Sequence, residues 1–123
     1  MNCLRFWLYF RVFLRCKIAA MPRPALVEKA ITSLLSSPGE TAIALRQAVF
    51  ERQRSGRDEL PENLAPLMEK IADRPWSVGD EDIRLLLQAG YSEDQLLEVI
   101  LAAAAGAGVR RLDAGLRALE EAE

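Results

Sequence analysis

Histidine is absent from this sequence, and cysteine is nearly so. Without an imidazole the chain cannot form the His–Ser or His–Cys pairs of nucleophilic enzymes, and it offers no histidine ligand to a metal. Its two cysteines, Cys3 and Cys16, have a spacing that fits neither a Cys-x-x-Cys motif nor a zinc site. Because residues 21–123 contain no thiol, we expect no catalytic residue, no metal and no cofactor there.

Acidic side chains outnumber basic ones, eighteen to twelve, beyond the first twenty residues. The formal net charge of the 123 residues is −2, and residues 1–20 hold four basic and no acidic side chains, so the remainder carries −6. Binding of nucleic acid needs clustered Lys and Arg to neutralise phosphates, and we therefore expect no nucleic-acid partner. The length suits one domain, residues 21–123, that buries a core without disulfide or metal.

Residues 1–20 form a separate segment that is basic and aromatic. Their longest uncharged run, Phe6–Phe10, is far shorter than the roughly 20 residues of a membrane span. Arg11 and Arg15 interrupt the apolar core that a signal peptide needs, and a transit peptide would hold more serine. Two interpretations stay open: a start codon assigned too early, with Met21 as the first residue, or a helix lying on a membrane surface. We expect membrane contact only in the second case, and a cytoplasmic protein otherwise.

No stretch has the two-residue alternation of a strand, so we predict an all-α fold. It is a compact bundle of about five helices with a long, buried C-terminal helix. The helices are expected at residues 25–35, 40–54, about 61–73, between the caps Ser77 and Gly90, and at about 92–121.

The spacing of apolar residues and the positions of prolines predict the inner faces and the starts of these helices. In the second, Ile43 and Phe50 are expected inside and Arg46 outside. In the third, Pro66 predicts a kink or a later start, because proline is poorly tolerated in a helix interior. Pro75 is expected to keep the chain extended.

Three short motifs predict helix ends. Ser77 with Asp80, and Ser92 with Gln95, have the spacing of capping boxes, in which a hydroxyl and an acid or amide satisfy exposed N–H groups. Gly90 is expected to end the helix between them.

The stretch around Gly106 and Gly108 allows two interpretations. A dinucleotide-binding loop needs a third small residue where Arg111 stands, and a preceding strand, so we reject it. One unbroken helix explains the pattern better. Residues 99–109 carry no charge, which predicts burial on all sides, with covering elements from a second subunit. We expect Gly108→Leu to disrupt the core or the oligomer.

One apolar stripe runs along this predicted helix at spacings of three and four residues. Its members are Leu97, Leu101, Ala104, Gly108, Leu112, Gly115 and Leu119.

Residues 60–119 read LPENLAPLMEKIADRPWSVGDEDIRLLLQAGYSEDQLLEVILAAAAGAGVRRLDAGLRAL. This half of the chain resembles the carboxymuconolactone decarboxylase and alkyl hydroperoxidase D-like (AhpD-like) family. The similarity lies in Val78–Ile83, in the turn Gln88–Ser92 and in Asp94–Ile100. The family implies an all-α fold that commonly assembles into oligomers.

Active family members carry a Cys-x-x-Cys followed by His, which reduces peroxides or exchanges disulfides. Residues 42–63, where the motif should lie, contain neither residue type. Glu98 matches a glutamate of the family and Arg111 an arginine, while Arg110 replaces a frequent asparagine. We expect a Glu–Arg pair there that supports packing.

Aromatic and charged side chains elsewhere are weaker candidates. Trp76 and Tyr91 flank the fourth helix and are expected to anchor the core, with a pocket rim as the alternative. Arg110 and Arg111 could bind an anion together with Arg117, but nearby acids oppose this.

Two functional hypotheses follow. The first is a redox-motif-free relative of the family, acting as a non-catalytic homo-oligomeric binding or accessory module for an unknown small molecule. The alternative is an active enzyme, a peroxide-related oxidoreductase or a carboxymuconolactone-type decarboxylase, that uses groups other than thiols. We favour the first, because acid–base catalysis near neutral pH without histidine needs strongly shifted carboxylates.

Overall fold

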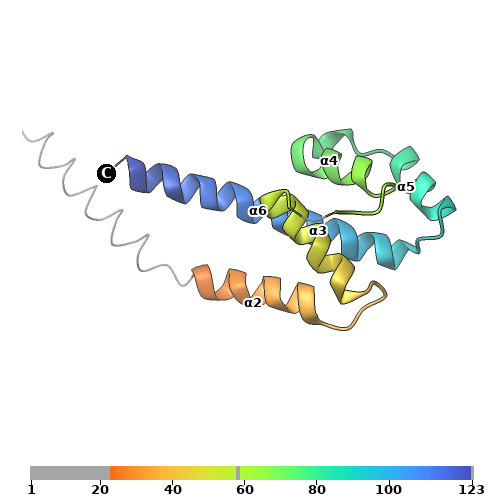
Figure 1. Ribbon diagram of the computed structural model, residues 1–123, viewed down its shortest axis with the longest axis horizontal. Helices are drawn as coiled ribbons and strands as arrows, with labels where there is room; N and C mark the ends of the chain where they lie inside the picture. The colour runs from red at the N-terminus through yellow and green to blue at the C-terminus, as the bar shows by residue number, and fades with distance from the viewer. Residues whose placement is uncertain (1–22, 58, 123) are drawn as a thin grey trace, which may run out of the picture. The chain divides into compact units, whose positions relative to one another are not determined.

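The computed structural model describes residues 23–57 and 59–122 (Figure 1). Its helices are, in chain order, α2 (Arg23–Ser36), α3 (Ile43–Ser55), α4 (Ala65–Asp73), the 3-10 turn η1 (Pro75–Ser77), α5 (Asp80–Gln88) and α6 (Glu93–Glu121). These residues contain five α-helices and no strand, which confirms the all-α prediction. The predictions made for residues 1–20 lie outside the described part of the chain.

The chain divides into two compact units, Met1–Ile31 and Thr32–Glu123. The described part of the first unit is the N-terminal portion of α2, where Leu26 is exposed rather than on an inner face. The second unit holds the hydrophobic core, and the sites described below lie within it.

Both α3 and α4 pack against α6, which is the longest helix in Figure 1. The core between them is made of aliphatic side chains from α3 to α6 and the turn before α4. Its buried members are Val49, Leu64, Leu67, Met68, Ile71, Leu86, Leu96, Val99, Ala102 and Ala103. Ile83 and Leu87 of α5 pack against this cluster, as their spacing predicts.

Gly106 marks the closest approach of α6 to α3. A Cβ atom at this position would overlap the backbone carbonyl oxygen of Phe50 and lie 3.0 Å from the Cβ of Gln53. The absence of a side chain at Gly106 therefore allows the two helices to touch. Nothing lies within 4 Å of the equivalent position at Gly108, so Gly108→Leu leaves the core of a single chain intact.

The face of α6 that the chain covers is the opposite of the predicted stripe. Its buried residues are Leu96, Val99, Ala102, Ala103, Gly106 and Ala107. In contrast, Leu97 is 56% and Leu101 is 47% exposed. The prediction that residues 99–109 are buried on all sides is wrong within one chain, because α3 and α4 cover a single face.

The predicted end of α5 and start of α6 are confirmed. Gly90 has a φ of +103°, a conformation that favours glycine and ends the α5 segment. The Ser92 hydroxyl accepts the Gln95 N–H at 3.1 Å, and the Gln95 side chain accepts the Ser92 N–H at 3.0 Å. Both halves of the predicted capping box are therefore present.

The predicted start of α5 is wrong in detail. Gly79 occupies the cap position, and the carboxylate of Asp82 accepts its N–H at 2.9 Å. The Ser77 hydroxyl instead donates to the Arg74 carbonyl at 2.7 Å. Pro75 begins the 3-10 turn and does not keep the chain extended.

Proline does set the start of α4. The helix begins at Ala65 with Pro66 in its first turn, where the missing N–H costs no helical hydrogen bond. The later start, one of the two predicted outcomes, is the one observed.

Candidate functional site

Glu98 of α6 binds the loop that leads into α3. Its two carboxylate oxygens accept the backbone N–H groups of Glu40, at 2.9 Å, and Thr41, at 2.8 Å. Gly39 leaves the room for this contact, since a Cβ there would lie 2.8 Å from the Glu98 Cδ. The carboxylate thus fastens the loop to the second turn of α6.

Arg46 of α3 completes this arrangement from the buried side. Its side chain is predicted to lie outside, but the residue is only 3% exposed. One terminal nitrogen donates to the Leu34 carbonyl at 2.7 Å and the other donates to the Ser37 carbonyl. Its Nε lies 4.0 Å from a Glu98 oxygen, so a buried cation faces the carboxylate.

These contacts favour the ionised form of Glu98. The N–H groups of Glu40 and Thr41 lower the pKa of Glu98 below its ordinary value, with a smaller contribution from Arg46, while partial burial opposes them. A carboxylate that is ionised and occupied by donors is a poor proton acceptor. The arrangement suits Glu98 to positioning the backbone rather than to acid–base chemistry.

Asp82 plays a similar part between α4 and α5. The Lys70 ammonium donates to both of its oxygens, at 2.6 and 2.8 Å. The hydrogen bond from Lys70, followed by that from the Gly79 N–H, lowers the pKa of Asp82. This carboxylate is also held by donors and joins two helices.

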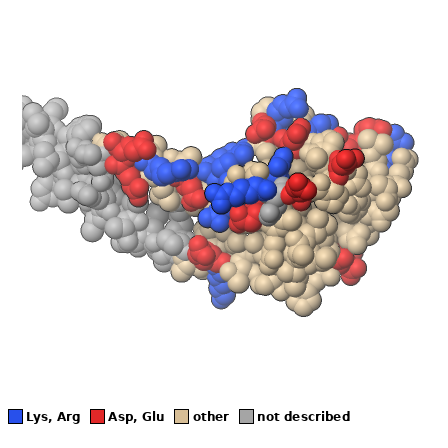
Figure 2. Space-filling model, in the orientation of Figure 1, with Lys and Arg blue, Asp and Glu red and all other residues tan. Residues whose placement is uncertain are grey.

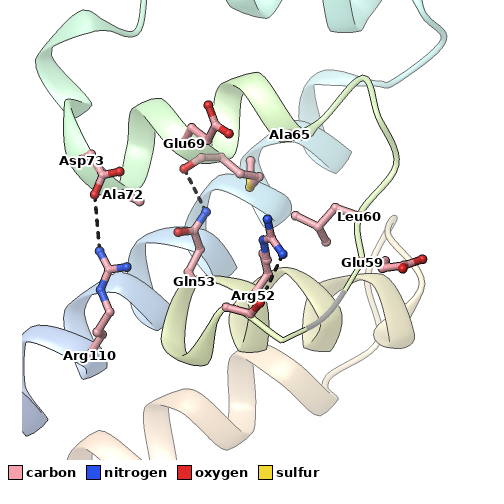
Figure 3. Close-up of a pocket in the computed structure, with 11 residues that line it drawn as sticks. Arg52, Gln53, Glu59, Leu60, Ala65, Glu69, Ala72, Asp73 and Arg110 are labelled. Atoms are coloured by element: carbon pink, nitrogen blue, oxygen red, sulfur yellow. Dashed lines mark hydrogen bonds and ion pairs between the residues drawn. The ribbon is translucent and has the colours of Figure 1, made fainter.

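A cavity of about 480 Å³ lies between α3, the loop after it, α4 and α6 (Figure 3). Its wall is mainly polar and is formed by Arg52, Gln53, Gly56, Glu59, Leu60, Ala65, Met68, Glu69, Ala72, Asp73 and Arg110. A volume of this size is typical of a small-molecule site, although such sites are usually more apolar.

The polar wall of the cavity is partly fixed by contacts of its own. The Gln53 amide of α3 is buried and donates to the Met68 carbonyl of α4 at 2.8 Å. Arg110 of α6 lies 3.6 Å from the Asp73 carboxylate, and Arg52 donates to the Gly56 carbonyl at 3.2 Å. The close-up shows these three contacts around the cavity (Figure 3). A charged or polar molecule in the site would therefore meet side chains that already have partners within the chain.

Charges of both signs surround this region. Figure 2 shows Lys and Arg side chains gathered over the crossing of α3 and α6, with Asp and Glu side chains beside them. A smaller hollow of about 230 Å³ next to the cavity brings together Arg54, Arg57, Arg110 and Arg117, but also Glu51 and Asp113. Arg111 is not among its lining residues. The acids reduce the attraction for an anion, as the sequence predicts for this part of α6.

Glu98 faces a different arginine from the predicted one. Glu98 faces Arg46, whereas the Arg111 guanidinium donates to the Ala72 carbonyl at the end of α4. Both contacts hold helices together, which fits the expectation that these charges support packing. Among the candidate residues chosen from the sequence, Arg110 is the one that lines the cavity.

The two aromatic candidates differ from each other. Trp76 is 81% exposed, so the prediction that it anchors the core is wrong, because it lies in η1, which has no buried residue. Tyr91 is half-buried against the core, and its hydroxyl lies 3.4 Å from the Asn63 side chain. Neither residue lines the cavity.

Sequence reasoning missed Arg46, Arg52 and Gln53. Each lies on α3, where the polar residues are expected on the outer face. A buried face of α3 that includes Arg46 and Gln53 becomes recognisable only when their carbonyl partners, at Leu34, Ser37 and Met68, are in place.

Comparisons with protein-family models, with curated proteins and with solved structures gave no match. Within residues 23–57 and 59–122, no group of three or more acidic side chains is arranged to hold a metal ion. No helix in that same part of the chain has both the length and the apolar character needed to cross a bilayer.

Proposed function

We propose that the chain is a non-catalytic, homo-oligomeric helical module that binds a small polar molecule or assists another protein. Its kinship with the carboxymuconolactone decarboxylase and AhpD-like family, and a cytoplasmic location, are parts of the same proposal. The pattern of residues 60–119 supports the kinship, and the all-α fold is compatible with it.

The non-catalytic assignment rests on the hydrogen bonds that the carboxylates of Glu98 and Asp82 accept. A general acid or base that works near neutral pH without histidine needs a carboxyl group whose pKa is raised. In both of these carboxylates the pKa is lowered, and backbone N–H groups and a cation occupy the oxygens. Both groups position secondary structure instead.

The cavity between α3, α4 and α6 is the proposed binding site. The lining includes charged donors, Arg52 and Arg110, and acceptors, Glu59, Glu69 and Asp73. This mixture favours a small molecule that carries both donors and acceptors over a simple anion or an apolar ligand.

Turnover assays test the non-catalytic assignment. The full chain with Cys3→Ser and Cys16→Ser is incubated with hydrogen peroxide and dithiothreitol, and separately with a carboxylated lactone. We expect peroxide loss and carbon dioxide release at the rates of the buffer alone. Turnover that scales with protein concentration would overturn the proposal in favour of an enzyme that uses groups other than thiols.

A further inference from the structure

One apolar face of α6 is left uncovered by the other described residues, 23–57 and 59–92. We define the α6 stripe as Leu97, Leu101, Ala104, Gly108 and Leu112. Leu97 and Leu101 are 56% and 47% exposed, Ala104 and Gly108 are exposed, and Leu112 is half-buried. Contiguous exposed apolar surface of this kind is typical of an interaction site.

We propose that the α6 stripe binds the α6 stripe of a second copy of this chain, with the two helices antiparallel. The inference rests on the homo-oligomeric part of the proposed function and names its interface. Leu97 and Leu101 of one copy lie over Gly108 and Ala104 of the other. Gly108 has open space where a side chain would stand, so it offers room for a leucine from outside.

Charge complementarity fixes the direction of the two helices. Glu93 and Arg111 are eighteen residues apart, which is five turns at about 3.6 residues per turn, so they lie on the same edge of the α6 stripe. In an antiparallel pair with two-fold symmetry, equal edges meet, and Glu93 of each copy lies beside Arg111 of the other. In a parallel pair with two-fold symmetry opposite edges meet, so Glu93 and Arg111 would not face each other.

The same register satisfies the charged and the apolar contacts. The midpoint between Glu93 and Arg111 is Ala102, and the midpoint between Leu97 and Gly108 lies between Ala102 and Ala103. Antiparallel helices also oppose their macrodipoles favourably.

Arg111 can make this contact without giving up its own. One of its terminal nitrogens donates to the Ala72 carbonyl within the chain. A guanidinium has five N–H donors, so others remain for a carboxylate of the second copy. Both Glu93 and Arg111 are exposed.

The apolar contact is tested by self-association of the full chain, with Cys3→Ser and Cys16→Ser, in sedimentation velocity over a range of concentrations. We expect a dimer, and we expect Leu101→Asp to raise its dissociation constant by at least about tenfold, because a buried leucine becomes a charge in each copy. Leu85→Asp on α5 is the matched control, since Leu85 is 54% exposed but lies off the α6 stripe. Circular dichroism verifies that both variants remain helical.

A charge exchange tests the direction and the register. Glu93→Arg and Arg111→Glu should each weaken the dimer by a few-fold, in the range of exposed ion pairs, and the double variant should recover the original dissociation constant. Arg117→Glu, an exposed arginine on the same helix but away from the α6 stripe, should change it little.

The outcomes separate the interface from the proposed function. A chain that stays monomeric at all concentrations overturns both the homo-oligomer and this interface. Association that survives Leu101→Asp, or a double charge variant that recovers nothing, overturns the interface alone. Turnover of peroxide or lactone bears only on the non-catalytic assignment.

Discussion

The two faces of α6 have nearly the same apolar character but opposite surroundings. Leu96 and Val99 are 2% and 0% exposed, while Leu97 and Leu101, on the opposite face, are about half exposed. Hydrophobicity alone therefore does not decide which face of this helix enters the core. What distinguishes the buried face is its neighbour, since the backbone of α3 makes contact at Gly106.

The largest difference in stability between the two faces of α6 is expected when a large side chain is removed from each. Leu96→Ala should lower the free energy of unfolding by about 2–5 kcal/mol, because it leaves a cavity in the core. Leu97→Ala, its neighbour in sequence, should change the stability of the monomer by less than about 0.5 kcal/mol. Urea denaturation of both variants at low protein concentration measures the difference. Equal losses would mean that the two faces are not distinguished as described.

Adding one methyl group to each face is the second test. Gly106→Ala should destabilise the protein by about 1–3 kcal/mol, since its Cβ meets the Phe50 carbonyl and one helix must move. Gly108→Ala meets open space and should instead stabilise it by about 0.5–1 kcal/mol through the higher helix propensity of alanine. Opposite signs in the shift of the melting temperature are expected. A stabilised Gly106→Ala would show that α3 and α6 do not touch there.

The same comparison shows how far the sequence determines the fold. Ends of helices that depend on neighbouring residues, such as Ser92 with Gln95, Gly90 and Pro66, are predictable because the whole contact lies within a few positions. The inner face of α6 is not predictable in this way, because spacings of three and four residues fit two stripes equally well. Choosing between them needs the position of α3.

The candidate site depends still more on tertiary contacts. Glu98 is expected to pair with an arginine only because of the resemblance, whereas the donors nearest to it are backbone N–H groups far away in the chain. Arg46 looks like an ordinary exposed arginine until the carbonyls of Leu34 and Ser37 lie around it. The sequence of side chains does not reveal which residues will bind backbone groups. It therefore could not show that Arg46 is the cation that faces Glu98.

Acidic pH, which protonates Glu98, tests the contact between Glu98 of α6 and the loop that leads into α3. Because the folded state lowers the pKa of Glu98, its contribution is fully present above its ordinary value of 4.5 and is lost as the pH falls through the lower folded value. Stability should thus decrease from about pH 5 towards pH 3. Glu98→Gln should be less stable at pH 7 and should show a shallower decrease with acid in denaturant midpoints. Some decrease should remain, since the pKa of Asp82 is also lowered. An unchanged slope would mean that Glu98 does not bind the loop.

The smallest effect concerns the residue that determines where α6 starts, and hence where both faces begin. Ser92→Ala removes the acceptor of the Gln95 N–H and should cost about 1 kcal/mol. Ser77→Ala is the matched control, because the Ser77 hydroxyl donates to the Arg74 carbonyl before η1 and does not cap α5. Chemical denaturation should therefore rank Ser92→Ala below Ser77→Ala in stability. The reverse order would restore the capping box that the sequence predicts at Ser77 and Asp80, and would place the start of α5 two residues earlier.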